Sequence, residues 1–132
     1  MTTSRTQTPL VPVSWGELLD KISILEIKAE RIASPAAVAN VRNELAMLSA
    51  SAAPLADNPQ LGGWMRSLKD VNEALWLIED SIREKEAEAK FDSGFIELAR
   101  SVYTTNDRRA KIKREINLAL GSQLIEEKSY KG

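Results

Sequence analysis

The chain has 132 residues, a formal net charge of −1, and neither cysteine nor histidine. The lack of cysteine excludes disulfide and thiol chemistry, and the lack of histidine removes the commonest general base and the commonest zinc ligand. The near balance of 18 basic and 19 acidic residues argues against a nucleic-acid surface reached through bulk charge. We therefore expect no cofactor and no bound metal, although carboxylate-bound magnesium or manganese stays open.

The length predicts one domain with a core of its own. No stretch approaches the roughly 20 apolar residues of a membrane span, and the polar start of the chain contains no signal-sequence core. We expect a single helical domain over residues 1–132, located in the cytoplasm. Residues 1–13 are predicted to form an extended arm, and residues 122–132 a polar tail.

The first predicted helix, residues 15–33, is the most strongly specified stretch. Ser14 and Glu17 have the spacing of a capping box, in which each side chain bonds the other residue's backbone N–H. An apolar stripe follows at spacings of three and four residues: Trp15, Leu18, Ile22, Leu25, Ala29 and Ile32. Ile24 and Ile27 lie on the opposite side, near Asp20. A helix with two apolar faces is central in its fold or touches a second chain.

Two further helices are predicted at residues 35–52 and 64–90. Ser34 and Pro35 suit the cap and the first position of the second helix. The loop between the helices contains Pro54, Pro59 and the pair Gly62-Gly63, which are typical of turns. The third helix carries a near-heptad apolar repeat, with Trp76, Glu79 and Arg83 beside it.

The fourth predicted helix, residues 95–120, ends at Gly121, a residue typical of a left-handed C-terminal cap. Its apolar stripe has a cation at its centre, Arg109, while Asn106 and Lys113 lie on the margins. A charge in that position must be paired or must face a solvent-filled cleft, because an isolated buried charge is too costly.

Three interpretations of this cluster stay open. In the first, Arg109 forms a partly buried ion pair with Glu79, with Glu26 as the other carboxylate on a suitable face. In the second, Arg109, Lys113 and Arg83 line a pocket for a carboxylate or phosphate, and Asn106 orients the ligand. In the third, the helix kinks near Thr104, which moves Arg109 off the core face.

Other signals are weaker. Trp76 could stack on a sugar or a base, although tryptophans at helical spacing more often belong to the core. Glu17 and Asp20 could be read as a metal-binding pair, but the cap already occupies Glu17. No glycine-rich phosphate loop and no Ser/His/Asp arrangement occurs in the sequence.

Four segments together resemble a bacterial and phage family of unknown function: residues 13–25, 75–80, 95–103 and 126–130. The resemblance covers about residues 11 to 130. Some members of that family lie among genes for surface-polysaccharide assembly, so the resemblance implies a genomic context but no reaction. A weaker likeness links residues 19–23 to the all-helical chorismate mutases. Leu19 stands where that family has a substrate-binding arginine, which indicates convergence.

We therefore predict an all-α protein, an antiparallel bundle of about four helices that self-associates through Ile24, Ile27 and Leu77. The favoured function is a non-catalytic binding or scaffolding protein, accessory to envelope polysaccharide synthesis, with a protein partner. The alternative is a small enzyme or ligand-binding protein for an anionic metabolite such as phosphate, a nucleotide sugar or a carboxylate. The candidate ligand-binding residues are Arg109, Lys113, Asn106, Arg83, Glu79 and Trp76.

Overall fold

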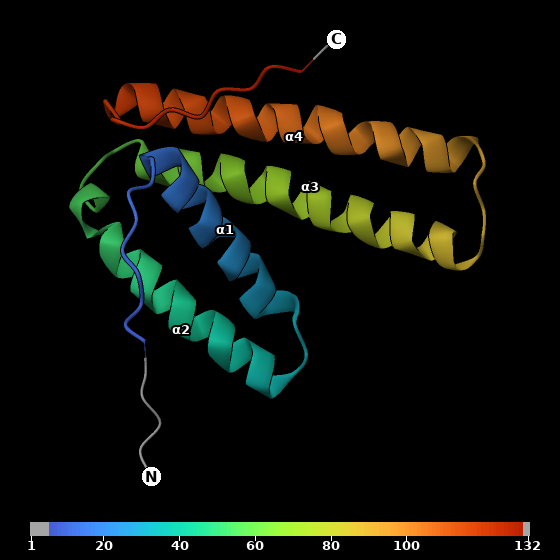
Figure 1. The fold of residues 1–132 in the computed structure, drawn as a ribbon, viewed down its shortest axis with the longest axis horizontal. Coiled ribbons are helices and arrows are strands. Elements are labelled where there is room, and N and C mark those ends of the chain that lie inside the picture. Colours follow the sequence, from blue (N-terminus) through green and yellow to red (C-terminus); the bar gives the residue numbers. More distant parts are fainter. Residues whose placement is uncertain (1–5, 131–132) are drawn as a thin grey trace.

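The computed structural model describes residues 6–130, which form four α-helices and no strand (Figure 1). The elements are α1 (Trp15–Arg31), α2 (Pro35–Ser51), the 3-10 turn η1 (Ala53–Leu55), α3 (Leu61–Ala87) and α4 (Ser93–Ala119). The predicted all-α class and the number of helices are confirmed. The largest errors are the two ends of α3, which were predicted at residues 64 and 90. The helix begins at Leu61, so that Gly62 and Gly63 belong to its first turn and not to the loop, and it ends at Ala87.

Helix α1 lies at the centre of the fold. Helices α3 and α4 run side by side as a long antiparallel hairpin, and α1 crosses one half of it (Figure 1). Helix α2 packs mainly on α1, on the side away from the hairpin. This arrangement explains the two apolar faces of α1, since α2, α3 and α4 all pack against it and leave the second face half-buried at Ile24.

The core lies where α1, α3 and α4 meet. Its buried members are Leu18, Leu19, Ile22, Leu55, Leu68 and Ile116. Leu55 comes from η1, so the short connection after α2 inserts an apolar side chain beneath α1. Burial of apolar side chains of this size is the main favourable contribution to folding.

Ile27 belongs to the interior, because its side chain is only 1 % exposed in the single chain. The part of the self-association prediction that relies on Ile27 is therefore wrong, since a residue covered by its own chain offers no surface to a second one. Ile24 is half-buried. Leu77 is 55 % exposed and remains available for a contact.

Helix α4 is continuous through residue 104, so the kink interpretation is wrong. The hydroxyl of Thr104 donates to the carbonyl groups of Arg100 and Ser101 within the helix, and it does not cap a new one. Arg109 consequently stays on the face of α4 that meets α1. Gly121 has a φ of 62°, as the predicted left-handed cap requires.

Residues 6–13 form the exposed part of the predicted arm, and residues 1–5 lie outside the described part. The tail after α4 runs back along that helix (Figure 1). None of the helices among residues 6–130 is long and apolar enough to cross a membrane.

The N-terminal cap of α1 gives a simple test of how this helix begins. The Ser14 hydroxyl accepts a hydrogen bond from the Glu17 backbone N–H at 3.1 Å. Replacing Ser14 with alanine should lower the free energy of unfolding by about 1 kcal/mol. Chemical denaturation measures this change. A midpoint that equals the wild-type value would contradict the assigned cap.

Candidate functional site

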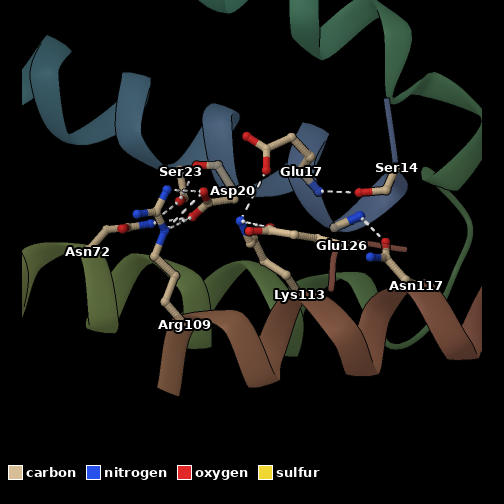
Figure 2. A network of polar contacts seen from close by, with 10 residues as sticks. Ser14, Glu17, Asp20, Ser23, Asn72, Arg109, Lys113, Asn117 and Glu126 are labelled. Carbon is tan, nitrogen blue, oxygen red and sulfur yellow. Dashed lines mark hydrogen bonds and ion pairs between the residues drawn. The ribbon is translucent and has the colours of Figure 1, made fainter. Parts of the chain in front are cut away.

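A polar cluster lies between the helices that surround the core. The guanidinium of Arg109, on α4, meets the carboxylate of Asp20, on α1, across the helix interface (Figure 2). Its Nε atom lies 3.0 Å from both carboxylate oxygens, and Nη2 also donates to Oδ2. Asp20 is fully buried, whereas the Arg109 side chain is 26 % exposed. These hydrogen bonds to Asp20 raise the pKa of Arg109, although burial acts in the opposite direction.

Two neutral side chains complete the surroundings of Asp20. The amide nitrogen of Asn72, on α3, donates to Oδ1 of Asp20 and to the hydroxyl of Ser23, each at 2.8 Å. The Ser23 hydroxyl donates in turn to the backbone carbonyl of Asp20 at 2.7 Å. The cluster therefore joins α1, α3 and α4 by charge-assisted and neutral hydrogen bonds in a setting with little water.

Arg109 uses only one edge of its guanidinium for Asp20. Nε and Nη2 form the bonds, while Nη1 lies on the side away from the carboxylate (Figure 2). Within residues 6–130, every buried side-chain nitrogen or oxygen has a hydrogen-bond partner. Among residues 6–130, Nη1 of Arg109 has no such partner, so it is in contact with solvent.

That solvent-facing side of Arg109 lines a groove of about 410 Å³ between α1, α3 and α4, which we call the Arg109 groove. Its apolar lining residues are Ile24, Ile27, Leu75 and Trp76, and its polar ones are Lys28, Asn72, Glu79, Asp80, Arg83 and Arg109. The guanidinium of Arg31 lies 6.0 Å from the ring centre of Trp76. A volume of this size and an apolar wall with a few fixed polar groups are typical of ligand sites.

A second ionic contact ties the tail to the helices. The ammonium of Lys113 lies 3.0 Å from a carboxylate oxygen of Glu17 and 3.1 Å from one of Glu126 (Figure 2). Burial lowers the pKa of Lys113, but the hydrogen bonds to the two glutamates outweigh it and raise the pKa overall. Beside this contact, Oδ1 of Asn117 accepts the Gly16 backbone N–H at 2.7 Å.

The model of a family of unknown function, DUF6165, matches residues 10–132. The chain belongs to the DUF6165 family. Neither a curated protein nor a solved structure matches it. The function of the family is unknown, so the chemistry open to this DUF6165 member depends on its own polar clusters.

The structure brings four of the six predicted site residues into one groove: Arg109, Arg83, Glu79 and Trp76. The other two are not among its lining residues. Lys113 is only 12 % exposed and is held by Glu17 and Glu126. Asn106 is half-buried and does not line the groove.

The predicted partner of Arg109 was wrong. Glu79 pairs instead with Arg83 one turn along α3, at 3.7 Å, and Glu26 lies 3.9 Å from Lys69. The capping box is also only half formed. Ser14 accepts from Glu17 as expected, but the Glu17 carboxylate bonds Lys113.

Asp20, Asn72 and Ser23 were missed by the sequence reasoning, although a signal for Asp20 existed. Asp20, Ile24 and Ile27 recur at helical spacing, so Asp20 lies on a second apolar face, as Arg109 does on α4. Two opposite charges set into apolar faces of adjacent helices favour pairing with each other. No comparable signal marks Asn72 or Ser23.

The contact between Lys113 and the tail predicts a pH-dependent contribution to stability. The hydrogen bond from Lys113 lowers the pKa of Glu126 below its ordinary 4.5. The contribution of Glu126 to the stability of the fold is therefore complete above about pH 4.5, and it is lost as the pH falls through the lowered pKa. The difference in unfolding free energy between the wild type and Glu126→Gln should be measurable at pH 7 and should decrease as the pH falls through the lowered pKa of Glu126.

Glu126 is half exposed, so the effect should be small and should decrease with salt. Glu115→Gln is the matched control, because Glu115 is an exposed glutamate of α4 outside the ion pairs of the described residues. A Glu126→Gln difference that does not decrease as the pH is lowered below 4.5 would contradict this assignment.

Proposed function

We propose that this DUF6165 member is a non-catalytic binding protein and that the Arg109 groove is its binding site. One observation carries the proposal. Arg109 is fixed through one edge by the buried Asp20 carboxylate and has a nitrogen free on the other side, where an apolar groove begins. A side chain held rigidly by a buried partner provides a pre-organised contact, which reduces the entropy lost on binding.

The same cluster argues for binding and against catalysis. Asp20 is 0 % exposed and accepts hydrogen bonds from both Arg109 and Asn72, so its carboxylate cannot reach a substrate. Its role is to position Arg109. The remaining carboxylates of the groove, Glu79 and Asp80, are adjacent on a helix and point in different directions.

A second candidate function is the binding of a multiply charged anion, such as a nucleotide sugar. Arg109 and Arg83 in one groove favour it. It is the weaker candidate, because Lys113 is held by Glu17 and Glu126 away from the lining residues, and Arg83 is paired with Glu79.

A role in envelope polysaccharide synthesis, a cytoplasmic location and a protein partner belong to the proposal as well. The first rests on the family resemblance alone.

Self-association is proposed through Leu77 and Ile24, and sedimentation of the wild type and of Leu77→Glu tests it. A monomeric wild type at high concentration would remove this part of the proposal.

The three tryptophans provide a test of the groove itself. Trp76 lines the groove, whereas Trp15 and Trp64 pack against the core. With 5-fluorotryptophan incorporated, 19F NMR should show three resonances, and Trp76→Phe assigns the one from the groove. Three ten-carbon probes are decanoate, 1-decanol and decyltrimethylammonium. We expect at least one of them to shift the Trp76 resonance, while the resonances of Trp15 and Trp64 stay unchanged. If none of them shifts Trp76, the groove is not a binding site.

A further inference from the structure

We propose that the Arg109 groove takes a ligand with a single acid group on an apolar body, such as a medium-chain carboxylate. This inference rests on the proposed function and adds the chemical class of the ligand. It follows from three properties of the groove: one open guanidinium edge, a nearly balanced set of charges, and an apolar wall.

The open edge of Arg109 selects an oxygen acid. A guanidinium presents five N–H donors in a plane, and Asp20 engages only those of Nε and Nη2 on one edge. The remaining donors lie side by side on Nη1 and Nη2, which is the geometry that a carboxylate accepts. Because Asp20 fixes the plane of the guanidinium, an incoming acid group meets donors whose direction is already set.

The charges around the groove limit the ligand to about one negative charge. Three cations line it, Lys28, Arg83 and Arg109, and a fourth, Arg31, lies 6.0 Å from the ring centre of Trp76. Two carboxylates, Glu79 and Asp80, also line it, and buried Asp20 adds a third behind Arg109. Four cations and three carboxylates leave about one surplus positive charge, which suits a single acid group. A polyphosphate or a dicarboxylate would meet Glu79 and Asp80 without further positive charge to offset them.

The apolar wall selects the body of the ligand. Ile24 and Ile27 come from α1, and Leu75 and Trp76 from α3, so the wall is built by two helices that meet at an angle. Ile27 is fully buried at its base, while Ile24 is half-buried. A hydrocarbon chain or ring placed there removes the half-buried side chains of Ile24, Leu75 and Trp76 from water, which contributes affinity that a small inorganic anion cannot obtain.

Four probes at concentrations below micelle formation separate these requirements, with the 19F resonance of Trp76 as the readout. Decanoate has the acid and the chain, 1-decanol the chain alone, decyltrimethylammonium the opposite charge, and inorganic phosphate a charge without a chain. Decanoate should bind at least about ten-fold more tightly than 1-decanol, as expected for one charge-assisted hydrogen bond. Phosphate should leave Trp76 unmoved.

Three outcomes overturn the ligand class, and the third overturns the proposed function with it. If 1-decanol or the cationic probe binds as tightly as decanoate, the groove binds apolar bodies without regard to the acid, and the proposed function survives alone. If phosphate shifts Trp76 as strongly as decanoate, the apolar body is not required. If no probe shifts Trp76, this inference and the proposed function fail together.

A conservative variant tests the role of Arg109 without leaving Asp20 unpaired. Arg109→Lys keeps a positive charge for Asp20 but removes the second edge of donors. Decanoate should then bind about ten-fold more weakly, with little change for 1-decanol. Arg114→Lys is the matched control, since Arg114 lies on α4 but faces the tail through Glu127. Equal affinity of wild type and Arg109→Lys for decanoate would contradict the assigned anchor.

Discussion

Replacing Arg109 with methionine should lower the free energy of unfolding by about 3–5 kcal/mol, because it leaves a charged carboxylate buried without its partner. With Arg109 in place Asp20 is 0 % exposed, so its charge is compensated by the guanidinium and not by solvent. Methionine retains most of the apolar length of the arginine side chain, which limits the loss of packing. Urea denaturation followed by circular dichroism measures the change.

Substitutions of Asp20 and of Arg109 should lower the stability by different amounts. Asp20→Asn removes the charge but keeps an oxygen for the Asn72 amide, and Arg109 can turn its charge toward the solvent of the groove. The single change Asp20→Asn should therefore cost less than Arg109→Met. The double variant should recover much of the loss caused by Arg109→Met. If the loss of unfolding free energy in the double variant equals the sum of the losses in the two single variants, Asp20 and Arg109 do not act as a pair.

Replacing Gly16 with alanine should be the second strongly destabilising change. A Cβ atom at Gly16 would lie 2.5 Å from the backbone oxygen of Lys113 and 2.9 Å from Oδ1 of Asn117. A backbone oxygen inside a helix cannot move aside, so α1 and α4 must separate. We expect a loss of about 3 kcal/mol, at the upper end of the range for overpacked interiors.

Gly62 and Gly63 are matched controls, because both lie in the first turn of α3 and a Cβ at either meets no atom within 4 Å. Alanine at these positions should be neutral or slightly stabilising, by less than about 1 kcal/mol. Thermal unfolding of the three variants measures the contrast. A Gly16→Ala protein as stable as its two controls would mean that α1 and α4 are not in close contact there.

Most of the fold could be predicted because each helix carries its own signals. Ser14 and Ser34 begin α1 and α2, and Gly121 follows α4. The start of α3 was harder to predict, since glycines favour a loop locally and only packing brings Gly62 and Gly63 into the helix. Arg109 was recognised from periodicity, because a cation on an apolar face needs a partner.

The identity of that partner could not be predicted in the same way. Helical periodicity shows which residues share a face, but not which faces meet, since this depends on the angles at which helices cross. Glu79 lies on the face of α3 beside the stripe, and α3 is the neighbour of α4. Because α1 lies at the centre of the fold, Asp20 and not Glu79 is the carboxylate that meets Arg109. The groove is likewise a product of three helices and has no signature in any one of them.

The hairpin of α3 and α4 extends past α1, and this has a consequence for how the molecule opens. Between residues 73 and 104, all of them described, no side chain is fully buried, whereas both helices have buried residues where α1 covers them. Two helices alone exclude little water, so the end of the hairpin should open locally with a smaller free energy than the whole protein. Amide hydrogens there should exchange with solvent faster than those near Leu68 and Ile116. Because Trp76 and Arg83 belong to the less protected part, a ligand in the groove should slow exchange well beyond its own contacts.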